Sequence, residues 1–169
     1  MVKVRDARPA DADGIRAVHA SAFPTPSEAE LVEKLTQSGD AVISLVAADD
    51  DGTIIGHILF SRMEAEGDGK VLAAMGLAPV AVVRDWRNQG IGTALIHSGL
   101  RVAESRGADI VFVLGEPGYY RRFGFDTKAA APFQSPYAGP HFPALILEPR
   151  FKAPAQGRAA YAPAFADLG

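Results

Sequence analysis

The order of apolar and polar positions predicts one strand and two amphipathic helices at the start of the chain. Val2 to Ala7 alternate in the manner of a strand. Asp11 is a suitable N-cap for a first helix, whose apolar residues then recur at helical spacing. A second helix is predicted to begin at a capping box formed by Ser27 and Glu30 and to end at Gly39.

The middle of the chain is predicted to form strands. Ala41 to Ala48 fit one strand, and Thr53 to Arg62 fit its hairpin partner. Val71 to Val83 form a long apolar stretch that Gly76 and Pro79 interrupt. Because proline removes a ladder hydrogen bond, Pro79 indicates an edge, a bulge or a splayed pair of strands.

The second half of the chain contains a longer helix, predicted over Gly90 to Arg106. Asp109 to Leu114 fit a short strand buried on both faces, Pro117 to Phe123 a short helix, and Leu145 to Leu147 a last strand. The tail from residue 129 is rich in alanine and proline but also holds several aromatic residues. We expect it to be irregular chain packed over the domain, with a candidate role as a wall of the substrate site.

Composition narrows the class of protein. The 169 residues fit one domain over 1–169, with a core over 2–126 and a C-terminal strand and covering segment over 127–169. The chain has no cysteine, which excludes a cysteine nucleophile, thiolate metal ligands and a covalent acyl-cysteine intermediate. The net charge of -3, with both signs interspersed, argues against nucleic acid as a partner.

The distribution of apolar residues bears on location. Residues 1–6 alternate charged and apolar side chains, where a signal peptide would need a continuous apolar stretch. No run approaches the roughly 18 apolar residues of a membrane span. We therefore expect a cytoplasmic protein with no membrane partner, acting as a monomer or a homodimer.

The most informative segment joins a predicted strand directly to a helix through a turn that contains glycine. It is Val80-Ala81-Val82-Val83-Arg84-Asp85-Trp86-Arg87-Asn88-Gln89-Gly90-Ile91-Gly92-Thr93. The first amides of that helix have no intrahelical partners, and with the helix dipole they form a site for a phosphate or pyrophosphate. Glycine at positions 90 and 92 would let an anion approach the backbone closely.

Three ligand classes use such a turn. A dinucleotide fold needs G-x-G-x-x-G, but Leu95 stands where the third glycine belongs. A P-loop needs Lys-Ser/Thr after its last glycine, and this sequence lacks that pair. The third pattern, [QR]-x-x-G-x-[GA], is met by Arg87, Gly90 and Gly92. It resembles the pyrophosphate loop of the GNAT acetyltransferases.

The resemblance extends beyond this loop. Leu77 to Val82 resemble the fourth strand of the GNAT family, which splays from the fifth strand and leaves a gap for acyl-CoA. Tyr119 to Phe125 resemble the family's FY-x-x-x-GF ending. With Val113 to Pro117, these segments resemble the YhbS-like branch of the family. The resemblance covers residues 2–126 and is strongest in their C-terminal part.

The resemblance implies a GNAT fold of the α/β (α+β) type. This is a mixed, mostly antiparallel, twisted sheet of six to seven strands with helices on both faces. Its fourth and fifth strands, near Val80 and Val111, are expected to be parallel and splayed. The resemblance also implies acetyl-CoA as co-substrate. No metal is expected, because His19, His97 and His141 are scattered without metal-ligand spacing.

Several site residues follow from the resemblance alone. The backbones of Val80, Ala81 and Val82 would hydrogen-bond the pantetheine arm like an added strand, and their amides could stabilise the oxyanion that develops on the thioester. Tyr120 corresponds to the tyrosine that gives a proton to the departing CoA thiolate, with Tyr119 as the neighbouring alternative. Reference pKa values near 10 for phenol and 8.5 for thiol make such a transfer plausible. The residues expected to wrap the pyrophosphate are Arg87, Asn88, Gln89, Gly90, Ile91, Gly92 and Thr93.

The sequence offers several candidates for the general base that removes a proton from the incoming amine. The candidates are Glu28, Glu30, His57 and Glu116. Glu30 already has a role in the predicted capping box, and His57 fits an ordinary histidine within a sheet. Glu116 is the preferred candidate, because it follows the fifth strand beside the expected thioester.

The predicted function is direct transfer of an acetyl group from acetyl-CoA to a primary amine, on a small molecule or a peptide, with no covalent enzyme intermediate. Two alternatives stay open. One is a non-catalytic acyl-CoA-binding or regulatory module on the same fold, because a fold does not fix a function. The other is a transferase for a longer acyl chain. The sequence has no Gly-x-Ser-x-Gly elbow, so a serine hydrolase is not supported.

Overall fold

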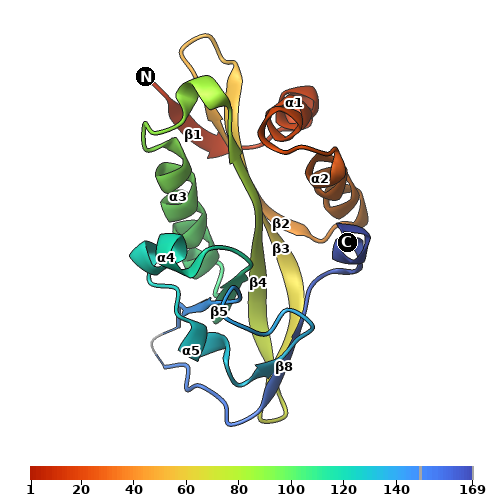
Figure 1. Cartoon of the computed structure of the whole chain (residues 1–169), viewed down its shortest axis with the longest axis vertical. Helices are drawn as coiled ribbons and strands as arrows, with labels where there is room; N and C mark the ends of the chain where they lie inside the picture. The colour runs from red at the N-terminus through yellow and green to blue at the C-terminus, as the bar shows by residue number, and fades with distance from the viewer. Residues whose placement is uncertain (149, 169) are drawn as a thin grey trace. The chain divides into compact units, whose positions relative to one another are not determined.

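The computed structural model describes residues 1–148 and 150–168. It contains a mixed, mostly antiparallel sheet of eight strands with helices packed against it (Figure 1). The chain divides into two compact units, which are described separately. They are residues 1–60, 79–102 and 163–169 in the first unit and residues 61–78 and 103–162 in the second.

The secondary structure follows the predicted order. The strands are β1 (Lys3–Asp6), β2 (Ala41–Ala48), β3 (Ile54–Gly67), β4 (Lys70–Val82), β5 (Ile110–Val113), β6 (Phe133–Gln134), β7 (Ala144–Ile146) and β8 (Gly157–Ala160). The α-helices are α1 (Ala12–Ala22), α2 (Ser27–Ser38), α3 (Ile91–Ser105), α4 (Pro117–Tyr120) and α5 (Thr127–Ala130). Short 3-10 helices are η1 (Pro9–Asp11), η2 (Arg84–Trp86), η3 (Arg121–Phe123) and η4 (Pro163–Leu168).

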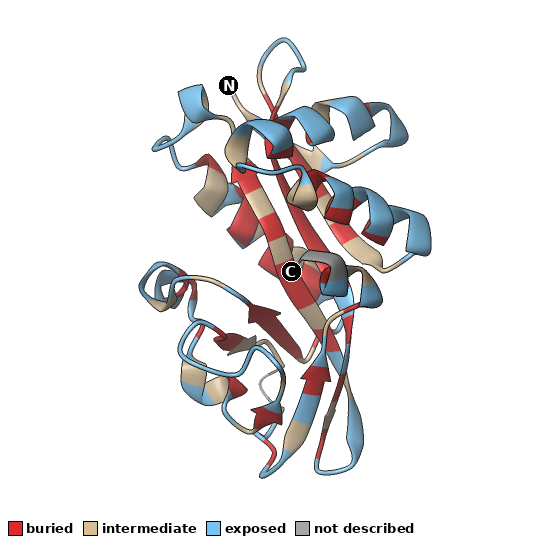
Figure 2. Cartoon of the chain, turned by 45° about the vertical axis from the view of Figure 1, so that its right-hand side comes forward, coloured by how far each residue is buried: buried red, intermediate tan, exposed pale blue. Residues whose placement is uncertain are grey.

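In the first unit, β1 pairs antiparallel with β2, and helices cover both faces of the strands. Helices α1 and α2 lie on one side and α3 on the other (Figure 1). Ile15, Val32 and Val46 form a buried cluster beneath α1 and α2. On the other face, Leu95 of α3 is completely buried. Figure 2 shows the buried residues along the strands and the exposed residues on the outer sides of the helices.

In the second unit, β4 and β5 run parallel, from the pair Ala74–Ile110 to the pair Leu77–Val113. Strand β7 pairs antiparallel with β5, β8 pairs antiparallel with β3, and β6 pairs parallel with β8. The rings of Phe112 and Phe142 stack with centroids 5.1 Å apart in the core of this unit. The predicted parallel fourth and fifth strands are therefore confirmed.

The predicted helix starts are wrong in their capping chemistry. Asp11 stands at the N-cap of α1 but makes no side-chain capping bond. Its carboxylate instead accepts hydrogen bonds from the guanidinium of Arg5, at 2.7 and 3.0 Å, and from the amide of Arg8. Pro26 is the N-cap of α2, so Ser27 lies inside the helix and the expected capping box with Glu30 does not form. Both helices nevertheless begin near the predicted residues.

The expectation for the tail is met in one part and wrong in another. The strand predicted at Leu145 to Leu147 is β7 (Ala144–Ile146), whereas α5, β6, β8 and η4 form in the segment expected to be irregular. Strand β8 consists of Gly157, Arg158, Ala159 and Ala160, which have no apolar alternation to mark a strand. Its strand conformation comes from pairing with β3, in which Ala65 lies opposite Ala159. The additional strands β6 and β8 raise the count to eight, above the predicted six or seven.

Candidate active site

The predicted phosphate loop lies in the first unit, between the end of β4 at Val82 and the start of α3 at Ile91. The turn η2 follows β4, and Asn88 and Gly90 then adopt positive φ angles of 62° and 78°. These left-handed conformations turn the chain into the helix, and Gly90 adopts one without the strain a side chain would add. Gly92 lies inside α3. Gly92 is the second residue of the helix, so its amide belongs to the first turn.

The start of α3 leaves amides for an anion. The amide of Ala94 donates to the carbonyl of Gly90 at 2.9 Å, so residues 91–93 precede the first helical hydrogen bond. Amides in that position are the usual free donors of a helix N-terminus. The first turn of α3 has no acidic residue that would repel an anion. The geometry suits a phosphate or pyrophosphate group.

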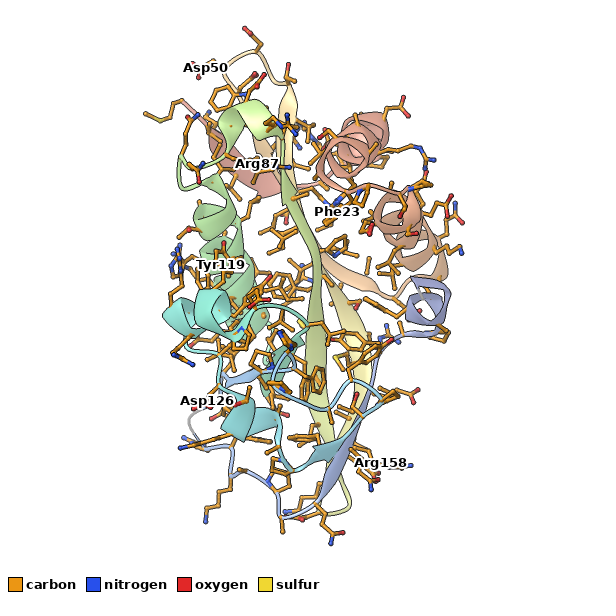
Figure 3. The ribbon with its side chains drawn as sticks, viewed as in Figure 1. Phe23, Asp50, Arg87, Tyr119, Asp126 and Arg158 are labelled. Carbon is orange, nitrogen blue, oxygen red and sulfur yellow. The ribbon has the colours of Figure 1, made fainter. Side chains whose placement is uncertain are left out.

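One side chain of the loop bonds to the strand before it, and a second bonds within the loop. The Nε of Arg87 donates to the carbonyl of Val82 at 3.1 Å, and the Nε2 of Gln89 donates to the carbonyl of Asp85 at 3.3 Å. Both residues are exposed, and Figure 3 shows Arg87 beside the end of β4. Arg87 therefore has a structural partner, while its guanidinium keeps further donors for a ligand.

The strand before the loop carries the residues expected to bind an extended arm. Ala81 is buried, while Val80 and Val82 are half-buried. The ladder between β4 and β5 ends at Leu77 and Val113, so all three residues follow its last pair. Beyond that pair the chain after β5 turns to another partner, because the amide of Gly115 donates to the carbonyl of His141 at 3.0 Å.

Tyr120 lies in the second unit at the end of α4 and is only 8% exposed. Its ring packs directly on the backbone of Gly115, where a β-carbon would lie 2.5 Å from Cε2 of the tyrosine. The rings of Tyr119 and Phe125 lie 5.0 and 5.7 Å from it. Burial, with a smaller contribution from Tyr119, raises the pKa of Tyr120 to about 12. The phenol is therefore neutral and able to donate a proton at any ordinary pH.

The neighbouring candidates face solvent. Tyr119 is 36% exposed, and Cζ of the Arg122 guanidinium lies over its ring, 4.7 Å from the ring centroid. The side chain of Glu116 is 80% exposed, and its Oε1 lies 3.7 Å from Nε2 of His141. The burial of the three side chains favours Tyr120 over Tyr119 as an acid inside the protein. It leaves Glu116 where it could act only on a group at the surface or through water.

The other base candidates are in the first unit. Oε1 of Glu28, in the first turn of α2, is buried without a hydrogen-bond partner, whereas Glu30 is exposed. His57 is completely buried and uses both ring nitrogens, at 2.8 Å to Nε2 of His19 and 2.8 Å to Oγ of Ser44. Burial lowers the pKa of His57 and of His19. A histidine in this state is a poor base for a substrate amine.

This buried His19–His57–Ser44 chain is a feature that sequence reasoning missed. The three residues are on α1, β3 and β2, with His19 and His57 separated by 38 positions and Ser44 and His57 by 13. Each histidine stands at an apolar position of its element, which is the only signal that could have indicated the pairing.

Among residues 1–148 and 150–168 no group of three histidine, aspartate or glutamate side chains lies close enough to hold a metal ion. In the same part of the chain no helix is both long and apolar enough to cross a membrane. A cavity of about 440 Å³ lies in the second unit beside α5 and residues 138–142, with Lys128 and Phe142 in its wall.

Comparisons with known proteins agree with this geometry. The acetyltransferase (GNAT) domain family matches residues 3–127. The protein named uncharacterized N-acetyltransferase YhbS, of Escherichia coli strain K12, is 39% identical over 121 residues, which are 72% of this chain and 71% of YhbS.

Solved structures match as well. The crystal structure of Escherichia coli YhbS in complex with CoA has a TM-score of 0.88 and 31% identity, covering 99% of this chain and 93% of that chain. A GNAT family acetyltransferase from Brucella melitensis in complex with acetyl-CoA has a TM-score of 0.80 and 34% identity, covering 98% of both chains. The chain therefore belongs to the GNAT family of acetyltransferases.

Proposed function

We propose that this protein transfers an acetyl group from acetyl-CoA directly to a primary amine. The observation that carries the proposal is the loop before α3, in which a positive φ at Gly90 leads to three amides ahead of the first helical hydrogen bond. Such a loop suits the pyrophosphate of CoA. Two relatives of similar fold, YhbS and the Brucella melitensis protein, were crystallised with CoA and acetyl-CoA.

The donor would be held mainly by backbone groups. We assign the pyrophosphate to residues 87–93 and the pantetheine arm to the strand edge at Val80, Ala81 and Val82. The position of these three residues after the last β4–β5 pair supports this assignment, because an extended arm can then add to the strand. An amide of the same strand segment would stabilise the oxyanion on the thioester carbonyl.

The reaction itself needs two proton movements. The amine nitrogen forms a bond to the carbonyl carbon, and the carbon–sulfur bond then breaks to release CoA. One proton leaves the amine and one reaches the sulfur. We assign the second proton to Tyr120, whose buried phenol is neutral. The chain has no cysteine, so an acyl-cysteine intermediate has no place in the reaction.

The pKa of Tyr120 constrains its role. Burial raises this pKa to about 12, above the reference value of a thiol, about 8.5. Before the carbon–sulfur bond breaks, the phenol therefore acts as a hydrogen-bond donor whose bond strengthens as negative charge develops on sulfur. This interaction belongs to the transition state rather than to the bound substrate. The proton of the phenol passes to the sulfur as CoA leaves, and the proton lost by the amine returns to the phenol oxygen through solvent.

Glu116 stays our preferred base, acting through a water molecule because its side chain is exposed.

The acceptor is a primary amine on a small molecule or a peptide, with the segment after residue 126 as a wall of its site. We do not assign a nucleic acid or membrane partner. We expect one domain over 1–169, working in the cytoplasm as a monomer or a homodimer.

A thiol-release assay tests the proposal. Free CoA thiol should appear from acetyl-CoA when a panel of primary amines is added, and its rate should depend on the amine. A non-catalytic CoA-binding module would bind acetyl-CoA but release no thiol with any amine. A transferase for longer acyl groups would release thiol faster from butyryl-CoA or hexanoyl-CoA than from acetyl-CoA.

A further inference from the structure

The cavity in the second unit has a wall that contains neither Tyr120 nor any residue of the phosphate loop. Its volume of about 440 Å³ falls within the roughly 300–1,000 Å³ that is usual for small-molecule sites. The floor is apolar, because Ala130 is 4% and Phe142 only 1% exposed. The cavity is lined by Thr127, Lys128, Ala130, Ala131, Ala138, Gly139, Pro140 and Phe142.

Backbone and ring contacts fix both sides of this cavity. On one side, the carboxylate of Asp126 accepts from the amide of Lys128 at 2.9 Å, and Asp126 also forms a backbone bridge to β7. On the other side, the amide of Phe142 donates to the carbonyl of Gly139 at 3.2 Å, and its ring stacks on Phe112 of β5. Both sides are therefore tied to the neighbouring strands β5 and β7. A site with such a fixed shape loses little conformational entropy when a ligand binds.

The charge at the cavity is positive. Lys128 is the only charged residue in the wall, within the part of the chain that the structure describes. Its side chain is exposed, and its ammonium forms no ion pair among the same residues. Because a lysine side chain is long and flexible, the ammonium can extend over the opening. Thr127 adds a hydroxyl that can donate a hydrogen bond.

We infer that this cavity binds a small organic carboxylate, with the carboxylate group at Lys128 and an apolar body, such as an aromatic ring, against Phe142. A phosphate would leave the apolar floor empty and would meet one ammonium in place of an arginine fork. A cationic ligand would meet only the charge of Lys128, which repels it. The inference does not depend on the proposed function, because every residue that carries it lies in the second unit.

Two ligands could supply such a carboxylate. One is the acceptor of the proposed reaction, because we assign a wall of its site to the segment after residue 126. The other is a separate ligand that leaves the amine site free. Both present the same chemistry to Lys128, and competition with the amine distinguishes them.

The binding test uses phenylacetate and its uncharged analogue phenylacetamide, each titrated into the whole protein and followed by amide NMR shifts. Wild type should bind phenylacetate about threefold or more tightly than phenylacetamide, as expected of a solvent-accessible ion pair. The shifts should fall on residues 127–131 and 138–142. Lys128→Ala should remove the preference by weakening phenylacetate alone, and Lys128→Arg should keep it. Inorganic phosphate should leave these amides unshifted.

Two matched variants control the test. Lys152→Ala removes an exposed lysine of the same unit that is outside the wall, and it should bind phenylacetate as wild type does. Ala138→Leu enlarges a side chain of the wall and should weaken phenylacetate and phenylacetamide alike. Equal affinity of wild type for the two probes, or equal phenylacetate affinity in wild type and Lys128→Ala, would overturn the inference. Absence of phenylacetate binding, or shifts confined to other residues, would overturn it as well.

The thiol-release assay identifies the source of the carboxylate. If the acceptor supplies it, phenylacetate should raise the KM of the best amine at unchanged kcat, and Lys128→Ala should abolish that competition. If a separate ligand supplies it, phenylacetate should leave this KM unchanged while it still shifts the amides of the cavity. Absence of thiol release with every amine would overturn the proposed function alone, because the binding test needs no turnover.

Discussion

Nε2 of His19 and Nδ1 of His57 lie 2.8 Å apart in the interior of the first unit, with both side chains completely buried. The two rings meet edge-on, and the ring of Phe23 stacks on His19 at 6.0 Å. Among the residues that the structure describes, Nδ1 of His19 is buried and has no hydrogen-bond partner. One ring must donate to the other, so the hydrogen bond is lost if both imidazoles are protonated, and burial disfavours a charge on either ring.

This pair predicts a loss of stability in mild acid. Burial lowers the pKa of both histidines below their ordinary value of 6.5. The unfolded chain therefore binds more protons than the folded chain once the pH falls below about 6.5. The free energy of unfolding should decrease by about 1.4 kcal/mol per pH unit for each histidine. Urea titrations between pH 7.5 and 5 would measure the decrease.

A matched variant isolates the contribution of the pair. His57→Gln keeps a polar side chain that can bond to Ser44 but removes one titrating ring. Its unfolding free energy at pH 7.5 should be lower than that of wild type, while its decrease between pH 7.5 and 5 should be smaller. A decrease as steep as that of wild type would assign the acid sensitivity to other groups.

The phosphate loop predicts the effect of a carboxylate at Gly90. Gly90→Asp places a negative charge at the start of α3, where the pyrophosphate is expected. Affinity for CoA should fall at least tenfold, a change of about 1.4 kcal/mol, by calorimetry. Arg87→Ala should have a smaller effect, because Arg87 is partly engaged with Val82 and most expected contacts are backbone amides.

The control for Gly90→Asp must share its backbone strain. Gly69, in the turn between β3 and β4, has a φ of 80° and open space around it, as Gly90 does. Gly69→Asp should therefore lose a similar amount of stability and bind CoA normally. Equal CoA affinity in folded Gly90→Asp and Gly69→Asp would move the phosphate site away from this loop.

Local patterns predicted the fold in some places and could not do so in others. Strand β2 has the predicted bounds, and the loop from Arg87 to Thr93 leads into α3 as expected, because both depend on neighbouring residues. Asp11 has the right residue type for a cap, but Arg5 takes its carboxylate. The bond from Arg5 to Asp11 depends on how the fold places the two residues, and the residue types alone do not predict it.

The tail shows the same limit more strongly. Strand β8 is held by hydrogen bonds to β3, more than 80 residues earlier in the chain, and its own sequence carries little strand signal. The ring of Tyr161, which follows β8, packs on Gly76 of β4, and no local pattern predicts that contact. Tyr120 could be predicted because its motif is local, from Tyr119 to Phe125.

A tight contact in the first unit predicts an unusual effect of Gly99→Ala. Gly99 lies in α3, where alanine would normally stabilise a helix by about 1 kcal/mol. A β-carbon at Gly99 would overlap the ring of Phe60, which is completely buried. Overpacking of this kind destabilises by about 1–3 kcal/mol, so the steric effect should win. Thermal unfolding should show a lower midpoint.

The matched control for Gly99→Ala is Gly118→Ala. Gly118 is in α4 and has open space where its β-carbon would be. This variant should be neutral or slightly stabilising, because only the conformational preference changes. If both variants raise the unfolding midpoint, Phe60 can move aside and the packing of α3 on the sheet is looser than the structure indicates.

Tyr120→Phe tests the proposed acid. The substitution removes one hydroxyl and keeps the ring that packs on Gly115. The rate of the chemical step should fall roughly 10²-fold, within the usual range for loss of an acid catalyst. Affinity for acetyl-CoA should change little, because the hydrogen bond strengthens only as the carbon–sulfur bond breaks. Tyr119→Phe is the control and should turn over normally. A loss of turnover in Tyr119→Phe alone would transfer the role to Tyr119.

The pH profile adds a second check, because a pKa of about 12 predicts that wild-type activity has no basic limb from Tyr120 between pH 7 and 10. Normal turnover of both variants would mean that water protonates the thiolate and that Tyr120 serves only to pack α4 against Gly115.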